Sequence, residues 1–234
     1  MSHPEVMPHG GLSEAFPDIF WVQGSVRMAP GVVINRVMVV LRHEGELTLI
    51  NAVRLDEEGL AALAALGRVT QVVKIGVHGM DDAFYVERYE ARYWAPPGAK
   101  TPIPASHELS PEGPQPVPWV RTLAFEHTVD PEVVLLADRA EGVLLTCDCV
   151  QDWPDLDRCS LMAKAVTKLM GFTGRRAVIG PPWKKRMTPE GGSLEPDFRR
   201  VAELPFEHLI AGHGKPMVGG AREALRATIE ATFT

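Results

Sequence analysis

The sequence lacks several features that would place it in a class at once. No uninterrupted apolar stretch reaches the ~20 residues that a membrane-spanning helix needs. Residues 1–17 carry His, Pro and Gly where a signal peptide would have a basic patch and an apolar segment. Only three cysteines occur, an odd number that does not predict a disulfide framework. We therefore expect a cytoplasmic protein with no membrane partner.

Basic clusters are also scarce. The chain has 24 Lys and Arg against 30 Asp and Glu, a formal net charge of −6, and its basic groups are short, as at 184–186 and 199–200. Binding to a phosphate backbone needs clustered cations, so we expect no nucleic-acid partner. The triplet Lys184-Lys185-Arg186 is either a solvated face or a contact for an anionic substrate.

The chain is long enough for one sizeable core. It has 234 residues, of which 45% are hydrophobic, and chains of this size commonly form a single domain. We predict a loose arm over residues 1–16 and one domain over residues 17–234. The sequence leaves homo-oligomer formation open.

Hydrophobic periodicity and turn residues predict a β-rich chain with helices after each group of strands. Asp56 is a natural N-cap for one of the helices, and the proline-rich segment 96–118 and the segment 171–192 read as irregular. A stripe of Leu161, Ala165 and Leu169 marks a later helix. The predicted strands are 19–26, 35–41, 47–53, 71–77, 91–95, 120–126, 133–138, 142–146 and 206–211, and the predicted helices are 57–66, 81–89, 160–170, 197–202 and 221–233.

The segment 72–84 combines an apolar run with a cluster of polar side chains. His78 and Asp82 lie where a predicted strand gives way to a predicted helix, and such junctions open into a crevice at the edge of a sheet. This segment resembles the His-x-His-x-Asp-His motif of the metallo-β-lactamase superfamily. His78 and Asp82 match that motif, whereas Met80 and Ala83 stand where the family has histidines.

Further segments resemble the same superfamily in the same order. Glu126-His127-Thr128 is similar to its Gly-His-Thr segment, Thr146-Cys147-Asp148 to its Thr-Gly-Asp strand end, and Gly212-His213-Gly214 to its final Gly-His-Gly. The resemblance extends from Ile19 to Phe233. Residues 91–98 and 219–226 also resemble a poorly characterised branch of the superfamily. The resemblance implies an α+β fold, an αββα sandwich with two sheets inside and helices outside.

The family's dinuclear site would be incomplete in this chain. The resemblance implies that the first metal position keeps His78 and His127, that the second keeps Asp82 and His213, and that Asp148 lies between them. Two imidazoles with a carboxylate suit Zn, Fe or Mn, so we expect one divalent transition metal or none. Asp82 and Asp148 are the candidate catalytic carboxylates, with Asp82 as a general base if it is not a ligand.

Two functions remain open at this point. The first is a metal-dependent hydrolase with a mononuclear or atypical site, acting on an unidentified small molecule. The second is a non-catalytic relative that retains the fold and a ligand pocket. Each residue also has a structural interpretation: Asp82 could cap its helix, Asp148 could belong to a turn, and His78 and His127 could be hydrogen-bonded loop residues. His213 is the strongest candidate, because flanking glycines let the backbone bend tightly and expose the imidazole. The histidines at 3, 9, 43, 107 and 208 are expected at the surface.

Overall fold

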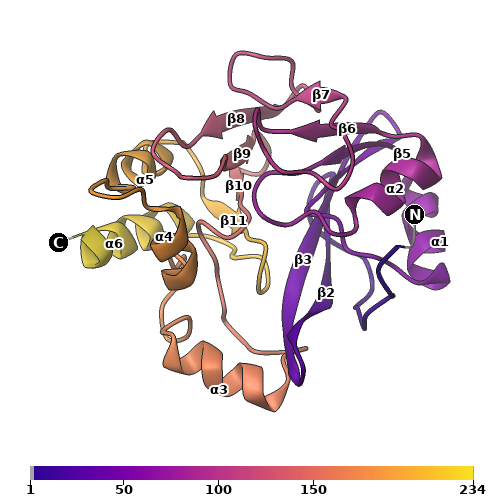
Figure 1. Cartoon of the computed structure of the whole chain (residues 1–234). Helices are drawn as coiled ribbons and strands as arrows, with labels where there is room; N and C mark the ends of the chain where they lie inside the picture. The colour runs from indigo at the N-terminus through magenta and orange to yellow at the C-terminus, as the bar shows by residue number, and fades with distance from the viewer. Residues whose placement is uncertain (1–2, 234) are drawn as a thin grey trace.

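Two β-sheets packed face to face form the centre of the protein. The computed structural model describes residues 3–233, and Figure 1 shows helices along the outer side of each sheet. Within these residues one sheet has seven strands and the other has four. The fold is an α+β sandwich, as the sequence predicts.

The larger sheet begins as an antiparallel meander and continues as parallel strands. Its first four strands pair antiparallel, and the fourth to the seventh pair parallel. Two helices connect the fourth strand to the fifth and the fifth to the sixth and cover the outer face, whereas a loop leads to the seventh. In spatial order the strands are β1 (Ser13–Phe16), β2 (Ile19–Ala29), β3 (Val32–His43), β4 (Glu46–Ile50), β5 (Arg68–Val73), β6 (Arg92–Ala95) and β7 (His107–Glu108), and the helices are α1 (Glu57–Leu66) and α2 (Asp82–Tyr89).

The smaller sheet carries the second half of the chain. Its strands, in spatial order, are β11 (His208–Ile210), β10 (Val143–Leu145), β9 (Val133–Ala137) and β8 (Val120–Ala124). β10 and β11 pair parallel, and the other pairs are antiparallel. The remaining helices are α3 (Leu161–Leu169), α4 (Pro181–Met187), α5 (Glu195–Ala202) and α6 (Ala221–Phe233). α3 lies apart from the others, near the tip of the β2–β3 hairpin (Figure 1).

Alternating side chains along the strands build separate cores. On β3, Val37, Val39 and Leu41 belong to the cluster between the sheets. Met38 and Val40 point the other way, into the cluster that holds α1 and α2. Strand side chains alternate between the two faces, so each strand buried on both sides contributes to two layers.

The chain follows the sequence prediction most closely where a cap or an amphipathic stripe fixes a helix. The Asp56 carboxylate accepts a hydrogen bond from the Gly59 N–H at 2.8 Å and begins α1. α6 covers the predicted residues. The segment 171–192 is not irregular throughout, because prolines at the first two helical positions begin α4. The last four residues of the predicted arm form β1 and pair with β2; residues 1–2 lie outside the described residues.

The proline-rich loop 96–118 packs on the core. Leu109 and Val117 are buried in the cluster between the sheets, and Ala99 and Lys100 line a cavity with Lys74. Among residues 3–233, no helix combines the length and apolar character needed to cross a bilayer.

Candidate metal centre

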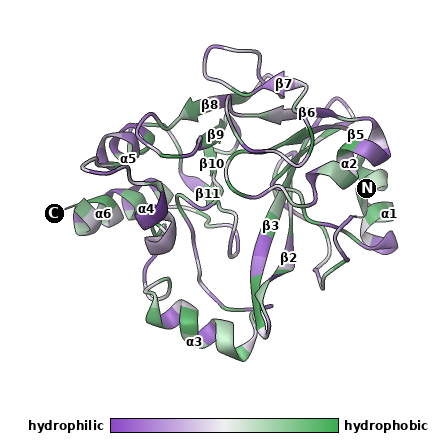
Figure 2. Cartoon of the chain, viewed as in Figure 1, coloured by the Kyte–Doolittle hydropathy of each residue, from purple (hydrophilic) through white to green (hydrophobic). Residues whose placement is uncertain are grey.

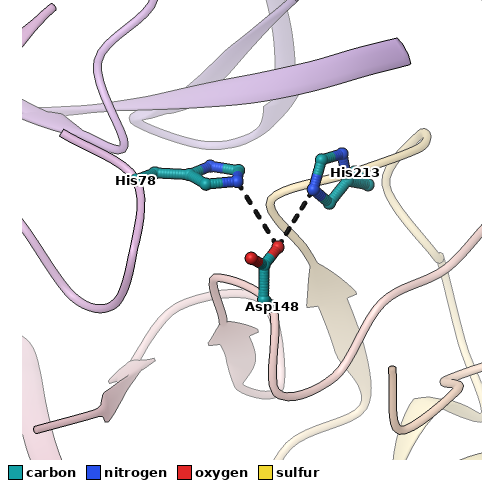
Figure 3. Close-up of side chains that lie close together, drawn as sticks. All are labelled: His78, Asp148 and His213. Carbon is teal, nitrogen blue, oxygen red and sulfur yellow. Dashed lines mark hydrogen bonds and ion pairs between the residues drawn. The ribbon is translucent and has the colours of Figure 1, made fainter. Parts of the chain in front are cut away.

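Three predicted ligands meet where strands from both sheets end. His78, Asp148 and His213 offer ligand atoms that all lie within 4.8 Å of one another. His78 follows β5 of the larger sheet, whereas Asp148 and His213 follow the neighbouring strands β10 and β11 of the smaller one (Figure 3). The two histidine rings lie nearly perpendicular to each other. Within the described residues, this is the group of His, Cys, Asp and Glu side chains arranged to hold a metal ion.

His213 is held firmly in one orientation. Its Nδ1 lies 2.6 Å from the backbone oxygen of Asn35, and the Trp153 ring stacks on it with the planes 13° apart. A carbonyl oxygen only accepts hydrogen bonds, so Nδ1 carries a proton, and Nε2 is the nitrogen directed at the centre. This is the arrangement by which an outer partner orients a metal-ligating imidazole.

The glycines that flank His213 allow the backbone to pass close to neighbouring groups and so place the imidazole at the centre. Gly214 has φ of +89°, and a Cβ there would lie 1.6 Å from the backbone oxygen of Asp152. A Cβ on Gly212 would meet the Cys147 oxygen at 3.0 Å and the His78 ring at 3.1 Å. The predicted role of these glycines in presenting His213 therefore has a direct steric basis.

Both histidines face the same carboxylate oxygen. Nε2 of His213 lies 3.0 Å from Oδ1 of Asp148, and Nε2 of His78 lies 3.4 Å from it. Burial acts to raise the pKa of Asp148, but the charge of His78 and hydrogen bonds from His213 and His78 outweigh it and lower that pKa. Burial lowers the pKa of His78, which favours its neutral form. Nε2 of His213 therefore either donates a hydrogen bond to Asp148 or can share a metal ion with it.

Asp82 lies outside this group and is bound internally. Its Oδ2 accepts a hydrogen bond from the Tyr93 hydroxyl at 2.7 Å. A Cβ on Gly79 would stand 2.9 Å from that oxygen and 3.0 Å from Lys74 Nζ, so the carboxylate and the ammonium approach the same point. Burial raises the pKa of Asp82 to about 6, against the lowering effects of the Tyr93 hydrogen bond, Lys74 and Arg36.

Lys74 also supports the loop that carries His78. Its Nζ donates to the His78 backbone oxygen at 2.6 Å, and the residue is buried. The neighbouring Asp81 forms a buried ion pair with Arg36. Sequence reasoning missed both Lys74 and Arg36, although a lysine inside the apolar run before His78 was a visible signal.

His127 lies outside the cluster as well. Its backbone N–H donates to Asp197 Oδ2 at 2.9 Å, and its Nδ1 lies 3.2 Å from the same oxygen. Its side chain is 45% exposed. Asp197 is in the first turn of α5, so His127 is positioned by a helix on the outer face. The geometry gives no support to His127 as a ligand of the same ion as His78, and the structure brings together three of the five predicted ligands.

Glu132 is a buried acid that sequence reasoning did not single out. Neither carboxylate oxygen accepts a hydrogen bond of normal geometry, and a Cβ on Gly76 would lie 2.6 Å from one of them. Burial first, and then the charge of Asp148, raise the pKa of Glu132 to about 8, while Cys149 and the Trp183 indole act to lower it. In the sequence, this glutamate directly precedes the apolar run 133–137, and that position indicates a buried acid.

An apolar cavity of about 410 Å³ adjoins the cluster. Asp148 and His213 line one part of it, and the β2–β3 hairpin, α3 and α4 supply most of the remaining wall. Its side chains are mainly aliphatic or aromatic. The lining residues are Met28, Val32, Ile34, Asp148, Gln151, Trp153, Val166, Thr167, Met170, Phe172, Pro182, Trp183, Arg186 and His213.

Comparison with known proteins gives a structural match over nearly the whole chain. No protein-family model matches the sequence, and no curated protein matches it. Among solved structures, DIM-1 metallo-β-lactamase exposed to ceftazidime is similar with a TM-score of 0.64 and 15% identity, over 97% of this chain and 99% of that one.

Two further structures agree with that match. A metallo-β-lactamase from Erythrobacter litoralis has a TM-score of 0.60 and 12% identity, covering 97% of this chain and 96% of that one. The mono-zinc form of FIM-1 from Pseudomonas aeruginosa has a TM-score of 0.61 and 12% identity, covering 98% of both chains. The fold predicted from the ordered motifs is therefore confirmed: this chain has the metallo-β-lactamase fold.

Proposed function

We propose that the protein is a metal-dependent hydrolase that holds one divalent transition metal ion with His78, Asp148 and His213. The observation that carries the proposal is the convergence of two imidazole nitrogens on one carboxylate oxygen: Nε2 of His213 and Nε2 of His78 lie 3.0 and 3.4 Å from Oδ1 of Asp148. Two imidazoles with a carboxylate suit Zn, Fe or Mn. The similar FIM-1 structure is itself a mono-zinc form.

The chain's own residues prepare the site for hydrolysis. A metal ion bound there supplies a Lewis acid and a bound water whose pKa falls toward ~7. The Asn35 carbonyl fixes the His213 tautomer, and Asp148 supplies the negative charge. Three protein ligands leave a coordination position open for water or substrate, as in catalytic zinc sites.

Asp82 supports a single ion in place of a pair. One oxygen of its carboxylate accepts from Tyr93 and lies near the Lys74 ammonium, so a positive charge of the protein already stands beside it. Met80, at the position of a family histidine, is 50% exposed and is a poor ligand for Zn, Fe or Mn compared with imidazole. These residues do not fit a second metal.

The non-catalytic alternative is favoured by the same reduced ligand set, because a relative that lost the ion would keep only the fold and the cavity. Metal content separates the two. Purified protein supplemented with Zn, Fe or Mn is analysed for bound metal and for hydrolysis of p-nitrophenyl acetate. About one ion per chain, with hydrolysis that disappears in His213→Ala but persists in His127→Ala, supports the hydrolase; absence of bound metal after supplementation supports the alternative.

The remaining predictions concern the surroundings of the protein. A cytoplasmic location is supported by three free, buried cysteines, since disulfides are rare in reducing compartments. An unidentified small molecule stays the predicted partner, with no nucleic-acid partner.

A further inference from the structure

The helix α3 presents an unusual distribution of apolar side chains. Leu161 and Leu169 of the predicted stripe are 86% and 89% exposed, while Ala163 and Thr167 are the buried residues of the helix. Figure 2 shows apolar residues along α3, at the margin of the molecule beside the tip of the β2–β3 hairpin. The predicted stripe therefore faces solvent and does not pack on the core.

A second part of α3 faces inward, toward the metal centre. Val166, Thr167 and Met170 line the cavity that also reaches Asp148 and His213. Val166 and Met170 are each 41% exposed, so the cavity is reached from outside. Its volume of about 410 Å³ falls within the roughly 300–1,000 Å³ of small-molecule sites, which are mostly apolar with a few convergent polar groups.

The opposite wall comes from the hairpin and the segment before α4. Met28, Val32 and Ile34 lie on the β2–β3 hairpin, and Phe172 and Trp183 come from the second half of the chain. Trp153 connects the cavity with the centre, because the same ring lines the cavity and stacks on His213. A molecule in this space would have its apolar part among these side chains and its polar end at Asp148 and His213.

We propose that this cavity binds the apolar acyl group of a carboxylic acid derivative, with the scissile carbonyl at the His78–Asp148–His213 centre. This inference rests on the proposed hydrolase function and adds the substrate class. The apolar wall would remove part of the acyl chain from water, whereas the polar end would reach the side chains proposed to hold the ion. Affinity then increases with acyl length, roughly two- to fourfold per buried methylene, the equivalent of up to ~0.8 kcal/mol.

Binding of sodium butyrate, hexanoate, octanoate and decanoate, measured by calorimetry on the metal-supplemented protein, tests the cavity without requiring turnover. We expect octanoate to bind at least tenfold tighter than butyrate. Val166→Asp should remove that gain, because it places a carboxylate in the wall. Leu169→Asp is the matched control on the same helix: its side chain is exposed and does not line the cavity, so its chain-length dependence should stay within twofold of wild type.

A cavity-filling variant keeps the test decisive if Val166→Asp fails to fold. Met170→Trp, which adds volume to the same wall, should weaken octanoate binding at least tenfold while leaving butyrate within about threefold. Equal affinity for all four chains in the wild type, or equal losses in Leu169→Asp and the cavity variants, overturns the proposal.

Hydrolysis separates failure of the substrate class from failure of the function. If p-nitrophenyl acetate is hydrolysed and the octanoate ester gives no higher kcat/KM, the hydrolase stands and the acyl cavity is wrong. If no ester is hydrolysed but alkanoates bind with the expected length dependence, the cavity stands as a binding site and the hydrolase fails.

Discussion

Two aspartates near the strand ends, Asp148 and Asp82, have different electrostatic surroundings. Around Asp148, two imidazole nitrogens converge on one carboxylate oxygen, at 3.0 Å from His213 and 3.4 Å from His78. Around Asp82, Tyr93 and Lys74 already supply a hydrogen-bond donor and a positive charge. The two sides therefore differ in what lies beside the carboxylate: two imidazoles at Asp148, and a hydroxyl and an ammonium at Asp82.

The largest effect on metal content and hydrolysis is expected from substitution at the His78–Asp148–His213 centre. His213→Ala should reduce bound metal from about one ion per chain to near zero and lower any ester hydrolysis by on the order of 10²-fold or more, since ligand geometry determines affinity. Elemental analysis and initial rates measure both. Retention of a full ion in this variant contradicts the proposed ligand set.

The other side can be converted toward a metal site only by removing its internal cation. Met80→His with Ala83→His should leave about one ion per chain, because Lys74 and Tyr93 still engage Asp82. Adding Lys74→Ala and Tyr93→Phe should raise metal content toward two. A second ion bound by the double variant alone would show that Lys74 does not occupy that side.

Removing the Tyr93 hydroxyl should show how much its hydrogen bond to Asp82 contributes to the stability of the protein. Tyr93→Phe leaves a buried carboxylate oxygen without its hydrogen bond, which costs about 1–3 kcal/mol in the free energy of unfolding. Urea denaturation measures the change, and metal content should stay at the wild-type level. An unchanged stability would mean that Lys74 alone suffices.

The buried carboxyl group of Glu132 should make the stability of the folded protein depend on pH. Its pKa is raised to about 8 in the folded protein from an ordinary value of 4.5, so the native state binds the extra proton between these values and stability falls as pH rises through that window. Glu132→Gln should remove this fall, and its melting temperature should exceed that of wild type increasingly from pH 5 to 8. Parallel melting curves across this range are the contrary outcome.

The smallest effect is expected at His127. His127→Ala should leave metal content unchanged and alter stability by at most about 1 kcal/mol, because its ion pair with Asp197 is partly exposed. The same metal and urea measurements apply. Loss of the ion in this variant would indicate that His127 is a metal ligand after all.

Local chemistry allowed much of the fold to be predicted. The Asp56 cap defined α1, and alternating apolar residues defined β2 and β3. α4 was missed because consecutive prolines usually signal a loop, yet they also suit the first positions of a helix. His208, expected at the surface, is buried against the Phe16 ring. That contact joins residues far apart in sequence, which no local pattern reveals.

The site was predictable only where ligands follow directly on strand ends. His78, Asp148 and His213 follow β5, β10 and β11, so strand order brings them together. Asp82 and His127 depend on long-range partners: Tyr93 for the first, Asp197 for the second. The partners of a carboxylate or imidazole decide its role, and the motif does not record them.

Asn35 links the β2–β3 hairpin to the candidate metal centre through hydrogen bonds. Its carbonyl accepts from His213, and its side chain accepts from the Gly214 N–H, while the adjacent Ile34 forms part of the apolar wall. Any molecule that tilts this strand also moves the carbonyl that sets the imidazole. The proposed acyl ligand and the proposed ion would therefore be thermodynamically linked, each changing the affinity of the protein for the other by the same factor.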